Sequence, residues 1–311
     1  MFGRTRLVKS LKDKNYYCIK IMNKARIVKL KQLPHVLNEV TILSRLRNLF
    51  AIEMRALFQD ENSVYMVLEY IPGGELFSHL RRNKIFEVAA YQFYAIEIAC
   101  ALYHLHQLQI VYRDLKPETV LLTKDGHIRL SEFGLAKQLD PTHTQTFTLC
   151  GTPEYVAPEV ILNQGYGTTV DWWALGVLLH EMIMGFPPFF GKNPFLVYQR
   201  ILEGRISMDP SLPSSTTGAV RGFLQVNRLS RLGCSSFDSV VRHSFFKGTD
   251  WDSAMQQLMV PPFVPSVTSL ADTSNYDFYP EELTQEVSSL SQDERRLFDR
   301  FDEILDRPKQ F

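Results

Sequence analysis

The side chains with the clearest capacity for chemistry lie in one short segment near the middle of the chain. The segment from Val111 to Glu118 holds Asp114 and Lys116, two residues apart beside apolar neighbours. A carboxylate and an ammonium group at this spacing could move a proton and hold negative charge on a reacting group. The same pair also fits an exposed turn closed by a salt bridge. The segment alone leaves both interpretations open.

Three more segments have a characteristic order and spacing around this one. Glu132 begins the sequence Glu-Phe-Gly eighteen residues after Asp114, and Ala-Pro-Glu starts twenty-five residues after Glu132. Upstream, Lys20 ends the sequence Tyr-Cys-Ile-Lys, and Glu39 follows nineteen residues later inside a predicted helix. Each segment is common by itself. Together and in this order they resemble the protein-kinase signature set of strand lysine, helix glutamate, catalytic loop, magnesium loop and Ala-Pro-Glu.

Longer segments narrow the resemblance. Residues 148–155, 171–176 and 272–276 are similar to the AGC family of serine/threonine kinases, and within it to the catalytic subunits of cAMP-dependent protein kinase, the X-linked relative included. The similarity runs from Gly3 to about Phe301. It implies an α+β, two-lobed kinase fold. The expected kinase domain covers residues 1–246, with a β-rich small lobe over about 1–70 and a helical large lobe over about 73–246, and an AGC-type tail covers 247–311.

The resemblance implies roles for the segments with chemistry. Lys20 would hold the α- and β-phosphates of ATP, and Glu39 would hold Lys20. Asp114 would orient a substrate hydroxyl and accept its proton, while Lys116 would lie beside the γ-phosphate. Thr152 would bridge Asp114 and Lys116. Phosphoryl transfer depends on positioning and charge stabilisation more than on covalent chemistry, which suits such a set.

Two further pairs and a set of nucleotide contacts follow from the resemblance. Arg113 would meet a phosphate on Thr148 and so order the activation segment. Glu159 and Arg231 would form a buried ion pair that is structural rather than catalytic. The other positions that would contact the nucleotide are Gly3, Thr5, Cys18, Leu68, Glu69, Ile71, Leu121, Ser131 and Tyr276.

A substrate class is implied as well, namely peptides with arginines two and three residues before the target Ser or Thr. The acidic residues at the matching positions are Glu75, Glu118 and Glu181, although three separated glutamates can also be ordinary solvated charges. The residues that would form an apolar pocket for the residue after the target are Leu149, Pro153 and Val156. The family's regulatory subunit carries an arginine-containing pseudosubstrate, so it is the expected protein partner.

Three departures from the family pattern affect the parts that handle ATP. The glycine-rich loop keeps only Gly3, and Thr5 replaces the apolar residue expected over adenine. Thr119 occupies the position of a magnesium-binding Asn, and Glu132 that of a magnesium-binding Asp. The extra methylene of Glu132 would move the carboxylate by about 1.5 Å. Magnesium demands near-ideal octahedral geometry, so such a shift should weaken its binding.

These departures leave three interpretations of the activity open. The first is an active serine/threonine kinase of reduced rate that uses ATP with Mg²⁺ or Mn²⁺. The second is a catalytically dead pseudokinase that binds regulatory subunits or pseudosubstrate peptides. In the third, the true N-terminus lies upstream of Met1, which could restore the glycine loop but not Thr119 or Glu132.

Hydrophobic periodicity predicts the elements that must position these residues. Short β-prone runs are expected at residues 6–8, 16–22 and 64–68, and helices at 36–46, 75–82, 88–106, 170–184 and 195–203. Gly218 and Gly222 are expected to interrupt the helix before Arg228. Beyond residue 247 the composition predicts an extended tail that ends in a charged amphipathic stretch. Because ten residues follow the Phe298-x-x-Phe301 pair, we expect altered docking of that pair on the small lobe.

Composition excludes several other classes of protein. Lys+Arg 34 balance Asp+Glu 34, which argues against non-specific binding to nucleic acid or to an acidic membrane. The four cysteines lie far apart without a Cys-x-x-Cys pair, so they indicate neither a disulfide framework nor a zinc site. The most apolar window, 172–190, is interrupted by His180, Glu181 and two prolines, which favours a buried helix over a membrane span. We therefore expect a cytoplasmic or nuclear location.

Overall fold

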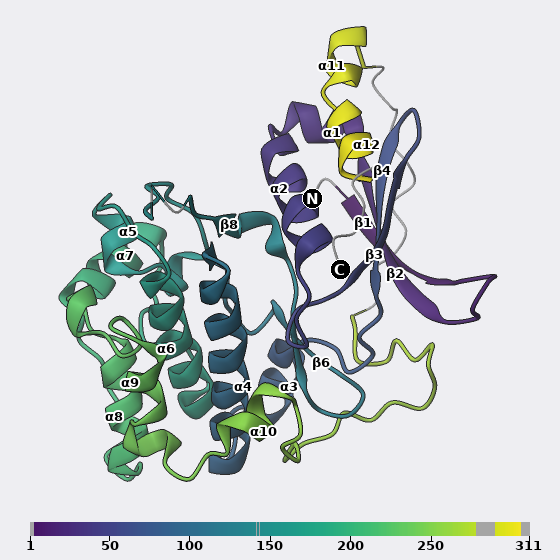
Figure 1. The fold of residues 1–311 in the computed structure, drawn as a ribbon. Helices are drawn as coiled ribbons and strands as arrows, with labels where there is room; N and C mark the ends of the chain where they lie inside the picture. Colours follow the sequence, from purple (N-terminus) through teal and green to yellow (C-terminus); the bar gives the residue numbers. More distant parts are fainter. Residues whose placement is uncertain (1–2, 141, 143, 278–289, 306–311) are drawn as a thin grey trace.

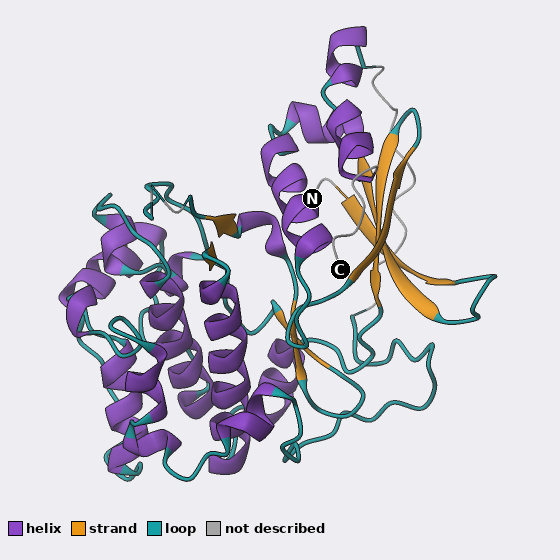
Figure 2. Cartoon of the chain, viewed as in Figure 1, coloured by secondary structure: helices purple, strands orange, loops and turns teal. Residues whose placement is uncertain are grey.

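The computed structural model describes residues 3–140, 142, 144–277 and 290–305. These residues form two lobes joined by a hinge at residues 69–74 (Figure 1). The small lobe contains a four-stranded sheet with helices beside it, whereas the large lobe is mostly helical (Figure 2). The predicted α+β, two-lobed architecture is confirmed.

The sheet of the small lobe is antiparallel, with the strand order β1-β2-β4-β3. The strands are β1 (Gly3–Lys9), β2 (Tyr16–Asn23), β3 (Met54–Gln59) and β4 (Ser63–Glu69). Strand β2 lies between β1 and β4, and its Lys20 pairs in register with Thr5 and Met66. Because side chains alternate along a strand, Cys18 and Lys20 point to the same face of the sheet.

Two helices follow β2, α1 (Lys24–Lys29) and α2 (Leu33–Arg45). In α2, Val36, Val40 and Leu43 recur at helical spacing and are buried. Glu39 lies on the same side of the helix and is also buried. A buried carboxylate is costly unless it is paired, so the position of Glu39 requires a partner from another element.

The large lobe is built around two long helices that pack against each other, α4 (Val88–Gln107) and α6 (Thr169–Met184). Both are apolar on most sides, as expected for central helices. Helix α6 ends at Gly185, whose φ of 81° is left-handed and where a Cβ atom would lie 2.5 Å from the Lys84 carbonyl oxygen. The predicted buried helix is thus confirmed, and no described helix is long and apolar enough to cross a membrane.

The remaining elements of the large lobe are short. The α-helices are α3 (Leu76–Asn83), α5 (Pro158–Ile161), α7 (Pro194–Glu203), α8 (Ser214–Phe223), α9 (Phe237–Val241) and α10 (Trp251–Met255). The 3₁₀ helices are η1 (Phe133–Leu135), η2 (Pro153–Tyr155), η3 (Arg228–Ser230) and η4 (Ser244–Phe246). Two strand pairs, β5 (Ile110–Val111) with β8 (Lys137–Gln138) and β6 (Val120–Leu122) with β7 (Ile128–Leu130), hold the loops that carry the acidic and basic segments.

The predicted interruption before Arg228 is wrong, because α8 continues through both glycines. One face of the helix, including Ala219, Val220 and Phe223, is buried and packs against α6. This burial outweighs the helix propensity lost at Gly218 and Gly222, which is about 1 kcal/mol each relative to Ala.

The tail crosses the hinge and returns to the small lobe. Gly74 has a φ of 78°, and a Cβ atom there would lie 2.5 Å from the Asn275 carbonyl oxygen, so only glycine admits the tail this closely. Further on, α12 (Asp299–Leu305) lies beside β3 and α2, and α11 (Gln292–Arg296) lies at the outer end of the small lobe (Figure 1). Phe298 and Phe301 are fully buried and stack 5.9 Å apart. The expected disturbance of their docking is therefore wrong. The rest of the C-terminal stretch, 306–311, lies outside the described residues.

Candidate functional site

Lys20 on β2 and Glu39 on α2 form an ion pair between the sheet and the helix behind it. The Lys20 Nζ atom lies 3.1 Å from both carboxylate oxygens of Glu39 and 3.2 Å from Oε2 of Glu132. Burial alone would lower the pKa of Lys20, but the two carboxylates outweigh burial and raise it. Lys20 is therefore a permanent cation at this point of the cleft.

A second cluster lies on the loop between β5 and β6. The Lys116 Nζ atom is 3.1 Å and 3.3 Å from the two oxygens of Asp114 and 3.1 Å from Oγ1 of Thr152. Lys116 thus joins a carboxylate on one loop to a hydroxyl on another. Burial raises the pKa of Asp114, although Lys116 opposes the shift.

A buried carboxylate on α6 fixes the backbone of this loop. Asp171 accepts hydrogen bonds from the backbone N–H groups of Tyr112 and Arg113, each at 2.9 Å. The Nε2 atom of His106 lies 2.8 Å from the same carboxylate. Arg113 has a φ of 67°, a conformation that is uncommon outside glycine and needs support from its surroundings. Sequence reasoning assigned no role to Asp171 or His106; the available signal was a carboxylate at the start of an otherwise apolar helix.

Thr119 is committed to the internal structure of the loop. Its side chain is buried, and its hydroxyl lies 2.8 Å from the Asp114 carbonyl oxygen and 3.1 Å from that of Lys116. The same oxygen accepts a hydrogen bond from the Lys116 N–H at 3.2 Å. The hydroxyl has one proton to donate, and one of its two lone pairs is already in use. Thr119 therefore stabilises the conformation of residues 114–119 through hydrogen bonds within the loop.

Glu132 occupies the other altered position and lies beside Lys20. Its φ of 54° is left-handed, and its side chain is 59% exposed. The carboxylate is an acceptor-only group and pairs with Lys20. Within the described part of the chain no cluster of three or more His, Cys, Asp or Glu residues could hold a metal ion. The exposed carboxylate of Glu132 fits one divalent cation that takes its remaining ligands from phosphate and water.

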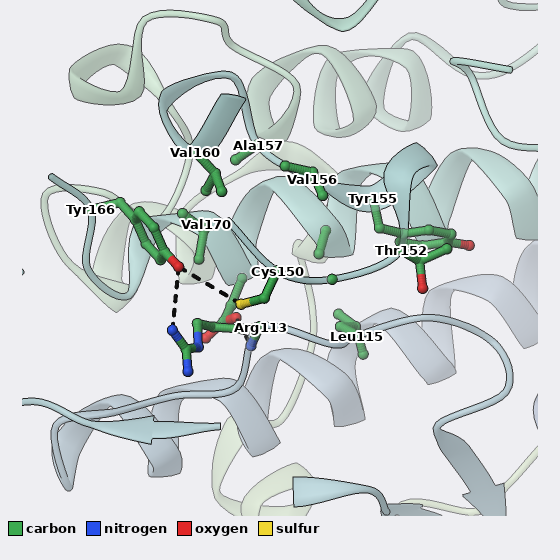
Figure 3. A pocket seen from close by; sticks show the side chains of 13 residues that line it. Arg113, Leu115, Cys150, Thr152, Tyr155, Val156, Ala157, Val160, Tyr166 and Val170 are labelled. Carbon is green, nitrogen blue, oxygen red and sulfur yellow. Dashed lines mark hydrogen bonds between the residues drawn. The ribbon is translucent and has the colours of Figure 1, made fainter. Parts of the chain in front are cut away.

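The segment before η2 packs against Arg113 through a tyrosine, as Figure 3 shows. The Arg113 Nη1 atom lies 3.3 Å from the Tyr166 hydroxyl, which donates a 2.5 Å hydrogen bond to the Thr148 carbonyl oxygen. The Cys150 sulfur lies 3.9 Å from the same hydroxyl. Arg113, Cys150 and Tyr166 line a cavity of about 20 Å³ together with Leu115, which is room for one water molecule. Arg113 and the exposed Thr148 are thus neighbours through Tyr166.

The positions implied for nucleotide contact lie on both sides of the hinge. Cys18 on β2 and Leu68 on β4 are cross-strand partners, and burial raises the pKa of the Cys18 thiol to about 11. Tyr276 from the tail donates a 2.5 Å hydrogen bond to the Ile71 carbonyl oxygen. The Glu69 carboxylate accepts instead from the Glu53 N–H at 3.0 Å. The others are distributed as Gly3 and Thr5 on β1, Leu121 on β6, and Ser131 just after β7.

One glutamate of the large lobe, Glu118, influences two others, Glu75 and Glu181. Burial raises the pKa of Glu75, with a further contribution from Glu118. Burial also raises the pKa of Glu181, which accepts a hydrogen bond from the Tyr155 hydroxyl and is affected by Glu118 as well. The structure therefore gathers the three acids into one region of negative charge. The nearby apolar positions differ, because Leu149 is exposed, Val156 is buried, and Pro153 begins η2.

Glu159 and Arg231 form a bidentate ion pair deep in the large lobe. The two N···O distances are 2.6 Å and 2.8 Å, and both side chains are buried. Arg231 also donates to the carbonyl oxygens of Thr169 and Gln225, so all parts of the guanidinium fork are engaged. The pair joins α5 to the segment after η3.

Comparison with known proteins gives one consistent result. A family model described as the protein kinase domain matches residues 1–246. The human cAMP-dependent protein kinase catalytic subunit PRKX is 44% identical over 302 residues, which cover 96% of this chain and 84% of the relative. The Drosophila melanogaster cAMP-dependent protein kinase catalytic subunit 3 is 40% identical over 96% of this chain and 51% of its own length. The Dictyostelium discoideum cAMP-dependent protein kinase catalytic subunit is 42% identical over 90% of this chain and 43% of its own length.

Proposed function

Because the chain belongs to the protein kinase family, as a serine/threonine kinase of the cAMP-dependent catalytic-subunit type, we propose that it phosphorylates Ser or Thr in arginine-containing peptides at a reduced rate. The observation that carries the proposal is the simultaneous presence of two ion-paired clusters. Lys20 is held by Glu39, and Lys116 is held by Asp114 and Thr152. Phosphoryl transfer requires such fixed charges more than it requires covalent chemistry.

In this proposal each cluster has a separate task. Lys20 neutralises the α- and β-phosphates of ATP, and Glu39 keeps its ammonium group in place. Asp114 orients the substrate hydroxyl and accepts its proton, while Lys116 balances the charge that develops on the γ-phosphoryl group. Because burial raises the pKa of Asp114, the carboxylate is a stronger base than an exposed aspartate would be.

Members of this family use ATP with a divalent metal ion, and the proposed metal ligand in this chain is Glu132. When bound, such an ion neutralises phosphate charge and fixes the phosphates in place. The buried Thr119 hydroxyl supplies no second ligand of the kind an Asn amide would offer, since its bonds lie within the loop. We therefore infer one protein ligand to metal and a preference for Mn²⁺, whose geometry is less strict than that of Mg²⁺.

The acidic region is proposed to bind the arginines before the target residue. Glu75, Glu118 and Glu181 would pair with guanidinium groups, which are planar, permanently charged donors. A pseudosubstrate segment with the same arginines would bind in the same way, so a cAMP-system regulatory subunit is the proposed partner. The exposed Phe147 adds an apolar surface beside this region.

A second candidate function is binding without catalysis. It is favoured by the 3.2 Å contact between Glu132 and Lys20, because a nucleotide must displace the carboxylate from the lysine before phosphate can use it. The internal hydrogen bonds of Thr119 also favour this alternative, because they leave it unavailable as a metal ligand. In this alternative the acidic region binds peptides, while the chain does not transfer phosphate.

Phosphate transfer from ATP to an Arg-Arg-x-Ser peptide by the purified chain distinguishes the two. We expect slow, metal-dependent incorporation that Asp114→Asn abolishes and that Thr119→Asn with Glu132→Asp accelerates. No incorporation by either the wild-type chain or the double variant would overturn the kinase proposal. Retention of the chain on an immobilised regulatory subunit, lost in Glu118→Ala and Glu181→Ala, would then support the binding function.

A further inference from the structure

A cavity of about 380 Å³ opens at the hinge. Four parts of the chain line it: residues 15–17 at the start of β2, the hinge at 69–72, the β6–β7 hairpin at 123–129, and the tail near 257 and 270. None of Lys20, Asp114 and Glu132 lines it. Sites for small molecules commonly measure roughly 300–1,000 Å³, so the volume admits a ligand of a few rings.

A carboxylate-backed histidine contributes to the wall of this hinge cavity. His127 lines the cavity, and its Nδ1 atom lies 2.6 Å from Oε1 of Glu97. The Glu97 side chain is fully buried, and its other oxygen accepts the Ile128 N–H at 2.9 Å. A buried carboxylate in this position favours a proton on Nδ1. In the described part of the chain His127 Nε2 has no hydrogen-bond partner, so it is open to a ligand.

The hydrogen-bond donors of the two arginines in the cavity are unequally satisfied. Arg129 is engaged, with Nε 3.4 Å from Glu69 and Nη1 2.9 Å from Gln257. Arg55 uses only Nη2, in a 2.8 Å contact with Glu53, and its side chain is 49% exposed. A guanidinium group has five N–H donors, so most of those on Arg55 stay available.

Lys124, on the hairpin, is exposed and has no ion-pair partner among the described residues. The acids that line the cavity are Glu69, which Arg129 already engages, and Asp125. Arg55, although Glu53 pairs with it, and Lys124 together leave more N–H donors open than the single open carboxylate of Asp125 can accept. The hinge cavity therefore has an excess of unsatisfied donors.

Aromatic residues supply the apolar part of the wall. Tyr17 and Tyr70 line the cavity, and their hydroxyls donate to the Asp13 carboxylate and the Asp272 carbonyl oxygen. Both rings are thus held in place by bonds at their outer ends. Leu270, which is 62% exposed, adds an apolar surface from the tail. Fixed rings next to the open N–H donors of Arg55 and Lys124 suit a flat ligand with one charged end.

We propose that the hinge cavity binds a small planar anion, an aromatic ring that carries a carboxylate or phosphate group. The anionic oxygens accept from Arg55 and Lys124, and the ring lies against the tyrosines. Because the lining comes from both lobes, the hinge and the tail, the ligand contacts all of these parts. The site shares Glu69 and Ile71 with the positions implied for nucleotide contact, but it includes neither of the two ion-paired lysines Lys20 and Lys116.

The test titrates the full chain with 2-naphthoate and 2-naphthyl phosphate, each in the presence of saturating ATP, with the uncharged 2-naphthamide for comparison. We expect saturable binding of at least one anion that ATP does not displace and that the amide fails to reproduce. Whichever anion binds more tightly identifies the charged group. Displacement by ATP, or equal affinity for the amide, would overturn the proposal.

Variants then locate the binding. Since loss of His127 would leave Glu97 buried without its partner, the substitutions are the exposed Arg55→Ala and Lys124→Ala, combined in one chain. We expect this variant to bind the anion about tenfold more weakly or worse, which corresponds to the loss of one good charge-assisted contact. Lys192→Ala, at an exposed lysine outside the cavity, is the matched control and should bind as the wild type does. Unchanged affinity in the double variant would place the ligand elsewhere and refute the assignment.

Discussion

Single side chains decide how the altered loop keeps its shape. Thr119 replaces a long amide by a short hydroxyl, yet the hydroxyl still reaches the backbone at residues 114 and 116. Local bonds of this kind are a general property of Thr and Ser, which compete for nearby backbone groups. The loop therefore retains the position of Asp114 while losing an outward-facing oxygen. A substitution at position 119 can therefore remove a metal ligand without moving Asp114, the proposed proton acceptor.

Restoring both metal-facing side chains should change metal preference. We expect wild-type ATP binding to be tighter with Mn²⁺ than with Mg²⁺, and Thr119→Asn with Glu132→Asp to strengthen the Mg²⁺-dependent binding. A misplacement of about 1 Å can cost on the order of 10²-fold in rate, so the double variant should also transfer phosphate faster. Calorimetric titration with each metal measures the first effect. As a control, Glu203→Asp makes the same change on the exposed face of α7 and should alter neither the metal-dependent binding of ATP nor the rate of phosphate transfer. Equal wild-type affinity with both metals would contradict this expectation.

The Glu159–Arg231 pair gives a second prediction for a single residue. Arg231→Ala leaves a buried carboxylate without its partner, and breaking such a pair costs about 3–5 kcal/mol of unfolding free energy. Arg242→Ala removes an equivalent charge from a surface pair with Asp238, where both side chains are mostly exposed. There the expected loss is within about 1 kcal/mol. Denaturant titration of the two variants gives the comparison, and similar losses would show that the buried pair is not structural.

Elements, rather than single residues, create the acidic region. Glu75 lies at the N-cap of α3, Glu118 on the loop before β6, and Glu181 in the last turn of α6. Each belongs to a different element, and only the packing of the large lobe makes their charges interact. Burial raises the pKa of Glu75 and that of Glu181, and the exposed Glu118 contributes to both shifts.

The raised pKa values predict a pH dependence for peptide binding. An arginine side chain binds the ionised carboxylate, so affinity should be complete above the raised pKa and fall as pH drops through it. Because these pKa values are raised, the loss should begin at a higher pH than for ordinary exposed glutamates. Titration of an Arg-Arg peptide against pH measures the midpoint. Glu181→Gln should bind more weakly and show a smaller pH dependence; an unchanged profile would exclude Glu181 from the binding region.

The sequence predicted elements far better than the contacts between them. Helices α4 and α6 could be found because their apolar residues are consecutive in the chain and bury most sides of the helix. The role of Asp171 could not be predicted, because its carboxylate accepts hydrogen bonds from backbone groups nearly sixty residues away in the chain. The error at α8 has the same origin, because burial against α6 outweighs a local preference. Motif spacing located Lys20 and Asp114, while their hydrogen-bond partners required the fold.

At the scale of the whole molecule, the tail connects the two lobes. It leaves the large lobe, crosses the hinge at Gly74, and ends with Phe298 and Phe301 between β3 and α2. Lys24 lies over the Phe298 ring at 5.2 Å, and the Gln59 side chain donates to Asp302 at 2.7 Å. Helix α2 also carries Glu39, so the docked tail and the Lys20 ion pair share one support.

Removing one buried ring should therefore loosen more than the tail. Phe298→Ala should cost about 3–5 kcal/mol in the docking of the tail, as for other buried Phe side chains. We expect faster hydrogen exchange in α2 and weaker ATP binding, because Glu39 is then less firmly held. Leu297→Ala changes an adjacent residue that is 46% exposed and should leave both properties near wild type. Normal exchange in α2 of the Phe298 variant would show that tail and helix are independent.

The contacts between hinge and tail also bear on how the protein is made. Tyr70, Asn275 and Tyr276 connect the hinge to residues 272–276 through three side-chain hydrogen bonds, which join positions 202, 203 and 205 residues apart. During synthesis the small lobe and most of the large lobe leave the ribosome before the residues that complete the hinge exist. Lobes can begin to fold as they emerge, since domains generally fold as units from the N-terminus onward. The three hydrogen bonds between hinge and tail must therefore be among the last contacts to form, and a chain that stops before residue 272 would lack all of them.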